Sequence, residues 1–331
     1  MLQVQFVKNG HDAFLDFIKA FAILGIIFNH TWIFREETPG LVLLFSVDVP
    51  LFLLVQVFHF LKKDSTLDFK KIFKRVFLPY FIIQAILFAY VICSNSGDYY
   101  HKLVIGFALF GFGPGSYYPL IYIQMALLLF WFKPLFKRLS KIQLLVIFLL
   151  LSEGLEIFCS LTNPPDPLYR LLIFRYVFLI YLGFLWVKEG IVVNNKMFLL
   201  SILSLLAEIY FLCFSMDNEP CFFNTNWSLS KWPCYYWVSN GLVCILYFVW
   251  KNLKKCQQVL KIVGALAKNS WEIFLMQMAS IFIIKQEMIP VQNRTAQYVL
   301  YMAIIWTVSI WGGYLLNKLW SNVLYGNKQY K

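Results

Sequence analysis

The chain has 331 residues, of which 60% are hydrophobic and only 14% are charged. In soluble domains roughly a quarter of all residues are charged. This composition therefore excludes an ordinary soluble domain and predicts an integral membrane protein. Its apolar runs approach the ~20 residues with which a helix spans a bilayer, whereas a membrane barrel would show short alternating segments. The net charge of +12 lies mainly in short loops between apolar runs, which indicates membrane topology and not nucleic-acid binding.

The apolar runs predict about ten spanning helices joined by polar loops, in one all-α integral-membrane domain over residues 1–331. A basic segment after the second run is cytoplasmic by the positive-inside rule, and this orientation places both termini in the cytoplasm. Segment 103–112 is too short to span comfortably and ends at a glycine-rich break, which predicts a re-entrant or surface element. The expected spans are 13–34, 41–61, 76–93, 117–132, 144–161, 171–187, 197–215, 234–250, 271–284 and 298–319.

The first span carries an acid, an amine and an imidazole, namely Asp16, Lys19 and His30. Lys19 and His30 are separated by roughly three helical turns, so they share one face and lie about 16 Å apart along the axis. Asp16 precedes Lys19 by three residues and falls on the same side. Ionisable groups inside a membrane helix are costly and usually face a polar interior. This stripe is therefore the candidate wall of a functional site.

Each member of the stripe has a catalytic and a structural interpretation. His30 suits a general base or a transient acyl carrier, but an imidazole at the outer headgroup level needs no function. Lys19 suits a charged donor group deeper in the bundle, but it can also snorkel to the interface or pair with Asp16. The separation of about 16 Å is too large for Lys19 to act on the same atom as His30.

A second candidate site lies in the basic segment before the third span. Lys71, Lys74 and Arg75 follow one another at the spacing that places side chains on one helix face. Ammonium and guanidinium groups bind phosphate oxygens by charge-assisted hydrogen bonds, and a CoA thioester is a cytosolic metabolite with such phosphates. Positive-inside topology by itself also explains the charge.

Other polar groups in the spans give weaker signals. Gln56, Gln124 and Gln277 either line a cavity or join helices. The seven cysteines contain no C-x-x-C pair, so no metal site is expected. Cys221 and Cys234 lie close in one predicted outer region, where a disulfide and two free thiols are equally consistent with the sequence.

Five motifs along the chain form one recognisable set. They are Leu15-Asp16 with Lys19 and His30, Val49-Pro50-Leu51-Phe52-Leu53, the run from Lys71 to Pro79, the stretch from Ser116 to Gln124 with Pro134, and the run from Asn269 to Leu275. Taken together, these motifs resemble the acyltransferase-3 family of integral-membrane O-acyltransferases. Four departures from the family pattern stand out: Lys19 replaces an arginine, Gln56-Val57 replaces Ser-Gly, Gln277 replaces a histidine, and the basic motif has lysine where the family favours arginine.

The resemblance implies transfer of an acyl group, expected to be acetyl, from cytosolic acyl-CoA to a hydroxyl of a cell-surface or lipid-linked glycan. It implies a multi-pass protein of the bacterial inner membrane in contact with lipids. In that interpretation His30, Lys19 and Asp16 are catalytic, and Lys71, Lys74 and Arg75 bind the donor.

Two alternatives use the same embedded charges. One is a transporter or flippase of a glycan or lipid precursor, although no internal repeat of the kind common in transporters is visible. The other is a catalytically degenerate family member, suggested by Gln56-Val57 and Gln277.

Overall fold

The computed structural model describes residues 2–4, 12–32, 47–62, 68–94, 103, 104, 106, 108, 110–162, 171–193, 199–206, 236 and 241–325. These residues are mainly helical, as the sequence predicts. Two short strands form one antiparallel pair, in which Leu2 lies opposite Val193 and Val4 lies opposite Ile191. The bounds of the strands are β1 Leu2–Val4 and β2 Ile191–Val193.

The helices follow the predicted apolar runs closely. In chain order they are α1 Ala13–Thr31, α3 Asp48–Lys62, α4 Phe69–Ile72, the π-helical turn η1 Phe73–Phe77, α5 Leu78–Cys93, α7 Tyr118–Arg138, α8 Lys141–Thr162, η2 Ile173–Tyr176, α10 Phe178–Glu189, α13 Val243–Leu253, α14 Gln257–Lys268, α15 Ser270–Ile283, η4 Gln286–Met288 and α16 Arg294–Tyr325. Predicted span 197–215 and the start of 41–61 lie largely outside the described residues.

Five helical segments in the described part of the chain are long and apolar enough to cross a membrane. They are Ala13–Thr31, Phe69–Cys93, Tyr118–Arg138, Lys141–Cys159 and Arg294–Asn322. Two further apolar helices, α13 and α15, are shorter. The membrane character of the chain is thus supported, while the count of ten spans and the cytoplasmic termini stay predictions.

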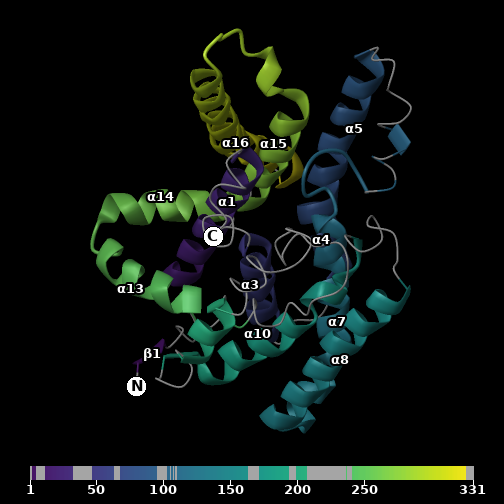
Figure 1. Cartoon of the computed structure of the whole chain (residues 1–331), viewed down its shortest axis with the longest axis vertical. Coiled ribbons are helices and arrows are strands. Elements are labelled where there is room, and N and C mark those ends of the chain that lie inside the picture. Colours follow the sequence, from purple (N-terminus) through teal and green to yellow (C-terminus); the bar gives the residue numbers. More distant parts are fainter. Residues whose placement is uncertain are drawn as a thin grey trace.

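Helix α1 is the innermost of the candidate spans. In its most apolar window 61% of the residues are buried, against 22% in α16. Its first half, with Leu15 and Ile18, belongs to an apolar core shared with α3, α7 and α10. Its second half, with Ile23 and Ile27, belongs to a second core shared with α5, α15 and α16. Figure 1 shows α1 between these two groups of helices.

Several helices are longer than the sequence predicts, among them α16, which runs over Arg294–Tyr325 against a predicted 298–319. The third span begins at Phe69, because α4, η1 and α5 run on from one another and carry the basic residues into the helix. Helix α7 continues through Pro134 to Arg138. Long cationic side chains at a helix end can extend toward water, so an apolar helix can continue past the point where charge begins.

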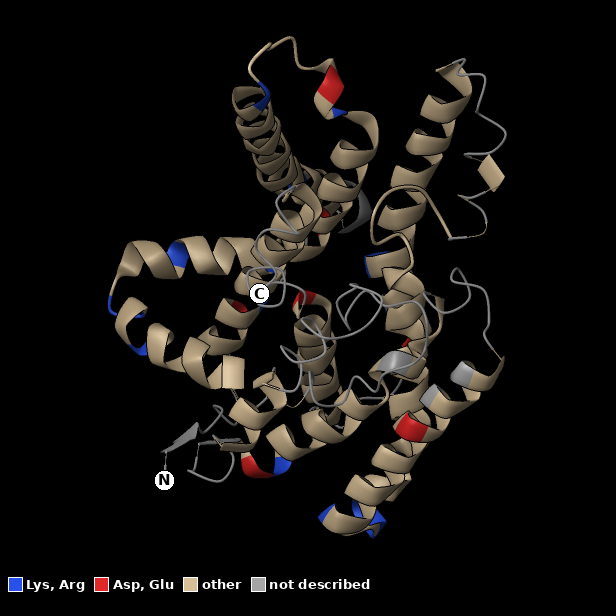
Figure 2. Ribbon diagram, viewed as in Figure 1, with Lys and Arg blue, Asp and Glu red and all other residues tan. Residues whose placement is uncertain are grey.

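Helix α14 lies in a stretch that the charge pattern assigns to a cytoplasmic loop. Val263 and Ala267 are buried, while Lys261 and Lys268 are exposed. Its apolar residues recur at helical spacing, and the helix packs against α1 (Figure 1). Figure 2 shows lysines on α14 and in the turn that joins it to α13. The segment is a packed amphipathic helix and not only a topology signal.

The glycine-rich break enters the bundle. Ser116 and Phe112 are 3% and 7% exposed. The Gln84 amide donates to the carbonyl of Phe112 at 3.1 Å and accepts from its N–H at 2.7 Å. The Tyr80 hydroxyl donates to the carbonyls of Phe110 and Ser116, the latter at 3.0 Å. The break is therefore fastened to the middle of the Phe69–Cys93 helix by Tyr80 and Gln84.

Replacing Gly113 by alanine is expected to destabilise the protein by about 1–3 kcal/mol. Gly113 has φ +86°, and a Cβ there would lie 2.7 Å from both the Cγ and the carbonyl oxygen of Met278. The matched control is Gly264→Ala in α14, where a Cβ meets nothing within 4 Å, so stability should rise by roughly 0.5–1 kcal/mol. Unfolding in detergent measures both, and equal stability of the two variants would contradict the packing described for the break.

Two exposed cysteines test the predicted orientation. Cys93 ends α5 on the predicted outer side, and Cys256 precedes α14 on the predicted cytoplasmic side; both are exposed. In variants that keep only one cysteine, a membrane-impermeant maleimide added to right-side-out vesicles is expected to label Cys93. Cys256 should react only after permeabilisation. The opposite pattern would show that the positive-inside assignment is inverted.

Candidate functional site

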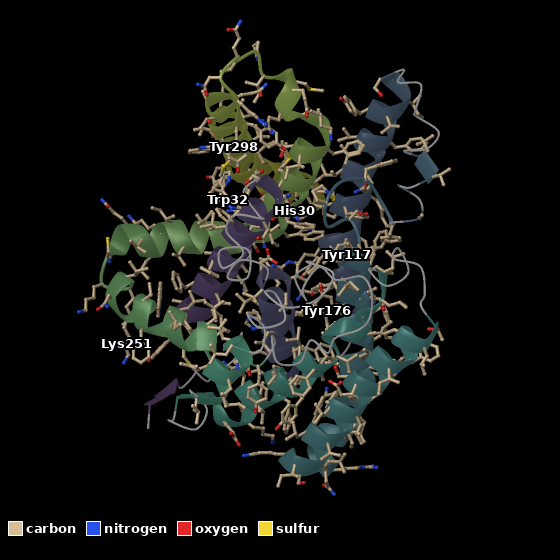
Figure 3. The ribbon with its side chains drawn as sticks, viewed as in Figure 1. His30, Trp32, Tyr117, Tyr176, Lys251 and Tyr298 are labelled. Carbon is tan, nitrogen blue, oxygen red and sulfur yellow. The ribbon has the colours of Figure 1, made fainter. Side chains whose placement is uncertain are left out.

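His30 occupies the last turn of α1, where the helix is about to end. Its side chain is exposed, while its neighbours Asn29 and Thr31 are 6% and 2% exposed. The chain leaves the helix at Trp32, which has an extended conformation. Figure 3 shows His30 at the tip of α1. An exposed base between two buried residues has a fixed backbone and an accessible ring.

Asn29 connects the tip of α1 to α3. Its Nδ2 donates to Oδ2 of Asp48 at 3.0 Å, and both residues are buried. The backbone N–H of Val49 donates to Oδ1 of Asp48 at 2.5 Å. Asp48 lies in the first turn of α3, where the helix dipole favours a negative charge. Sequence reasoning missed this pair, although an acid directly before the Val49-Pro50 motif in an apolar run was a usable signal.

Thr31 connects the same tip to α16. The Tyr298 hydroxyl donates to the Thr31 carbonyl at 2.7 Å, and Trp306 Nε1 donates to Thr31 Oγ1 at 3.3 Å. The Thr31 hydroxyl in turn donates to the carbonyl of Ile27 at 2.8 Å. Tyr298 and Trp306 lie 267 and 275 positions away from Thr31 in the sequence, and no local pattern predicts these contacts.

Asp16 and Lys19 form an ion pair near the other end of α1. Lys19 Nζ lies 3.5 Å from Asp16 Oδ1, and their side chains are 26% and 12% exposed. Because α1 is one unbroken helix, the pair stays about 16 Å from His30 along the axis. The structure therefore joins Asp16 to Lys19 and does not bring either to His30. The pairing that sequence analysis raised as a structural alternative is present.

The basic residues Lys71, Lys74 and Arg75 all have exposed side chains. Lys71 belongs to α4, whose N-terminus is capped by Asp68. Lys74 and Arg75 belong to the π-helical turn η1. This geometry is rare in proteins overall, and where it occurs it is often at a functional site. The three cationic side chains are thus accessible to a ligand.

An aromatic cluster lies where α3, α7 and α15 meet. The Tyr118 ring lies 5.6 Å from Phe274, 6.1 Å from Trp271 and 6.5 Å from Phe52, measured between centroids. The indole of Trp271 stacks on Phe274 at 5.4 Å. These rings give the junction of the three helices a rigid apolar surface.

The three glutamines have different roles. Gln124 joins segments, since it donates to the carbonyl of Leu171 at 2.6 Å and accepts from the N–H of Ile173 at 3.0 Å. Gln56 donates to the carbonyl of Tyr122 at 3.0 Å. Gln277 is fully buried, and neither its amide nitrogen nor its amide oxygen has a hydrogen-bond partner among the residues that the structure describes.

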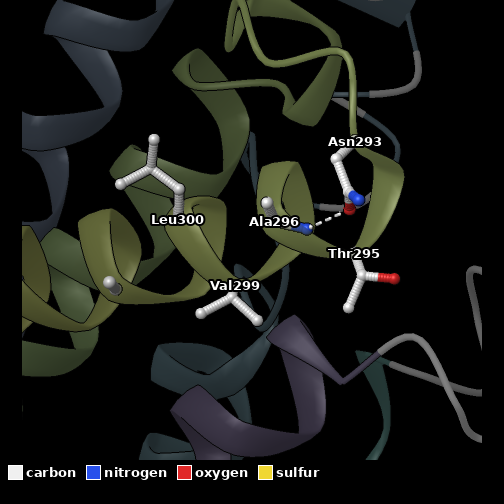
Figure 4. A pocket seen from close by; sticks show the side chains of 6 residues that line it. Asn293, Thr295, Ala296, Val299 and Leu300 are labelled. Atoms are coloured by element: carbon white, nitrogen blue, oxygen red, sulfur yellow. Dashed lines mark hydrogen bonds between the residues drawn. The ribbon is translucent and has the colours of Figure 1, made fainter.

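A surface hollow on α16 is not a candidate site. Its lining residues include Asn293, Thr295, Val299 and Leu300 (Figure 4). None of the residues that line it is charged or can act as a base near neutral pH. The hollow lies on the outward face of a candidate span, and no basic side chain such as that of His30 lines it.

The fold and the site define a multi-helix membrane protein with a rigidly held histidine at the tip of its innermost span. The chain belongs to the acyltransferase-3 family, because a family model described as an acyltransferase domain matches residues 12–316. The resemblance found in the motifs is thus confirmed, and the chain is a membrane acyltransferase by family. No curated protein and no solved structure matches it.

Proposed function

We propose that this protein transfers an acyl group, in the first instance acetyl, from cytosolic acyl-CoA to a hydroxyl of a cell-surface or lipid-linked glycan in the bacterial inner membrane. The observation that carries the proposal is the exposed and anchored position of His30 in a chain of this family. Membership of an acyltransferase family also favours acyl transfer over the transporter alternative.

In this proposal, His30 acts on the acyl transfer itself. As a general base, its imidazole takes the proton from the acceptor hydroxyl, whose oxygen attacks the thioester carbonyl. The carbon–sulfur bond then breaks, and the CoA thiolate leaves and takes up a proton. As an acyl carrier, the imidazole attacks first and passes the acyl group on to the hydroxyl. Both routes need an accessible ring, which His30 has.

The donor in this proposal binds through its phosphates. Lys71, Lys74 and Arg75 have exposed side chains at the predicted cytoplasmic end of the third span, and three cations suit the phosphates of acyl-CoA. Asp16 and Lys19 lie near the N-terminus of α1. There Lys19 contributes positive charge toward the donor, and Asp16 holds its ammonium group in place.

His30→Ala is expected to reduce transfer of labelled acetyl from acetyl-CoA to a membrane glycan by roughly 10²–10⁴-fold, the usual contribution of a general base. Membranes with matched amounts of folded protein provide the measurement. Lys261→Glu, an exposed change on α14, serves as the control and should retain transfer. Undiminished transfer by His30→Ala would remove His30 from the mechanism.

Lys74→Glu should raise the KM for acyl-CoA by about tenfold or more, because a charge-assisted contact contributes roughly 1.5–3 kcal/mol. The value of kcat should change little, since the substitution lies at the donor phosphates and not at the reacting atoms. Steady-state rates at varied acyl-CoA measure both constants, again with Lys261→Glu as the control. An unchanged KM would reduce the cluster to a topology signal.

A further inference from the structure

We propose that two buried clasps, Asn29 with Asp48 and Thr31 with Tyr298 and Trp306, position the imidazole of His30 for transfer. The inference rests on the function proposed for His30 and adds positioning residues from α3 and α16 to it. The clasps hold the residues directly before and after His30. The three helices α1, α3 and α16 therefore meet at the histidine (Figure 3).

The position of His30 makes such clasps necessary. Helix α1 ends at Thr31, and the last carbonyls of a helix have no partner within it. Helix ends also open more readily than helix centres. A catalytic group must be held within roughly 0.5 Å of its working geometry, and a 1 Å displacement can reduce the rate about 10²-fold. A base one residue from a helix end needs support from outside the helix.

The Asp48 clasp depends on the two carboxylate oxygens of Asp48. They accept from two donors, Asn29 Nδ2 at 3.0 Å and the N–H of Val49 at 2.5 Å. In Asp48→Ala both oxygens are removed, so both donors lose this acceptor. Exchanging the residues, as Asn29→Asp with Asp48→Asn, provides an acceptor at position 29 and a donor at 48. The exchanged pair keeps an oxygen for the Val49 N–H.

The Thr31 clasp depends on the Tyr298 hydroxyl. That hydroxyl gives the Thr31 carbonyl a buried donor at 2.7 Å, in place of the partner that the helix can no longer supply. Tyr298→Phe removes only this oxygen and keeps the buried ring, which is 2% exposed. The indole of Trp306 holds the Thr31 side chain from the same helix. The backbone carbonyl of Thr31, the residue after His30, is thereby held by α16.

The test compares Asp48→Ala, Tyr298→Phe and the Asn29/Asp48 exchange with Ser309→Ala. Ser309 is a matched control, because it is a buried hydroxyl on α16 that faces Ser280 of α15, 3.5 Å away, and not α1. Two quantities are measured: amide hydrogen exchange in the peptide spanning 27–32, which does not depend on activity, and kcat and KM for acyl transfer.

We expect Asp48→Ala and Tyr298→Phe to accelerate amide exchange at the tip of α1 and to lower kcat about tenfold to a hundredfold. The KM for acyl-CoA should change less than about twofold, because neither substitution alters Lys71, Lys74 or Arg75. The exchanged pair should recover most of kcat, and Ser309→Ala should change neither quantity.

Unchanged amide exchange in both clasp variants would overturn the proposal. Faster exchange with unchanged kcat would also overturn it, provided His30→Ala is inactive, and would leave the proposed function standing. Full transfer by His30→Ala would instead contradict the proposed function, and the exchange data would then describe helix anchoring without a catalytic role.

Discussion

Polar groups inside an apolar bundle need partners, and this constraint organises α1 and the helices around it. Inside a bilayer no water is available to form hydrogen bonds with an unsatisfied polar group. Asp16 therefore has Lys19, Asn29 has Asp48, and Thr31 has Tyr298. Each partner fixes either a turn of α1 or a neighbouring helix. The satisfied groups build a rigid frame, and His30 is the residue that this frame leaves exposed.

Because α1 passes through both apolar cores, it also fixes the distance between its two ends. Lys19 and His30 are held about 16 Å apart by one continuous helix, so Asp16, Lys19 and His30 do not form a compact triad. The first helix is better understood as a scaffold that reaches from a charged end to an exposed base. The π-helical turn with Arg75 and the buried glycine break add irregular backbone at the edges of this scaffold.

The comparison of sequence and structure depends on how local each feature is. The spacing of Asp16, Lys19 and His30 could be read directly, because a helix turns position numbers into faces and distances. Helix α14 was missed because its lysines were counted for topology, although its apolar residues have helical spacing. Asp48 was missed for a related reason: it stood beside a recognised motif and was not weighed as a buried acid.

The sequence by itself determined the membrane class, the helical architecture, the family resemblance and the place of His30 on the first span. These follow from composition, from periodicity and from motifs within single helices. Only the tertiary structure decided that Asp48, Tyr298 and Trp306 hold the residues beside His30, and that α1 joins two cores. The physical reason is that a hydrogen bond between helices depends on how they pack, and packing is a property of the whole chain that no single segment contains.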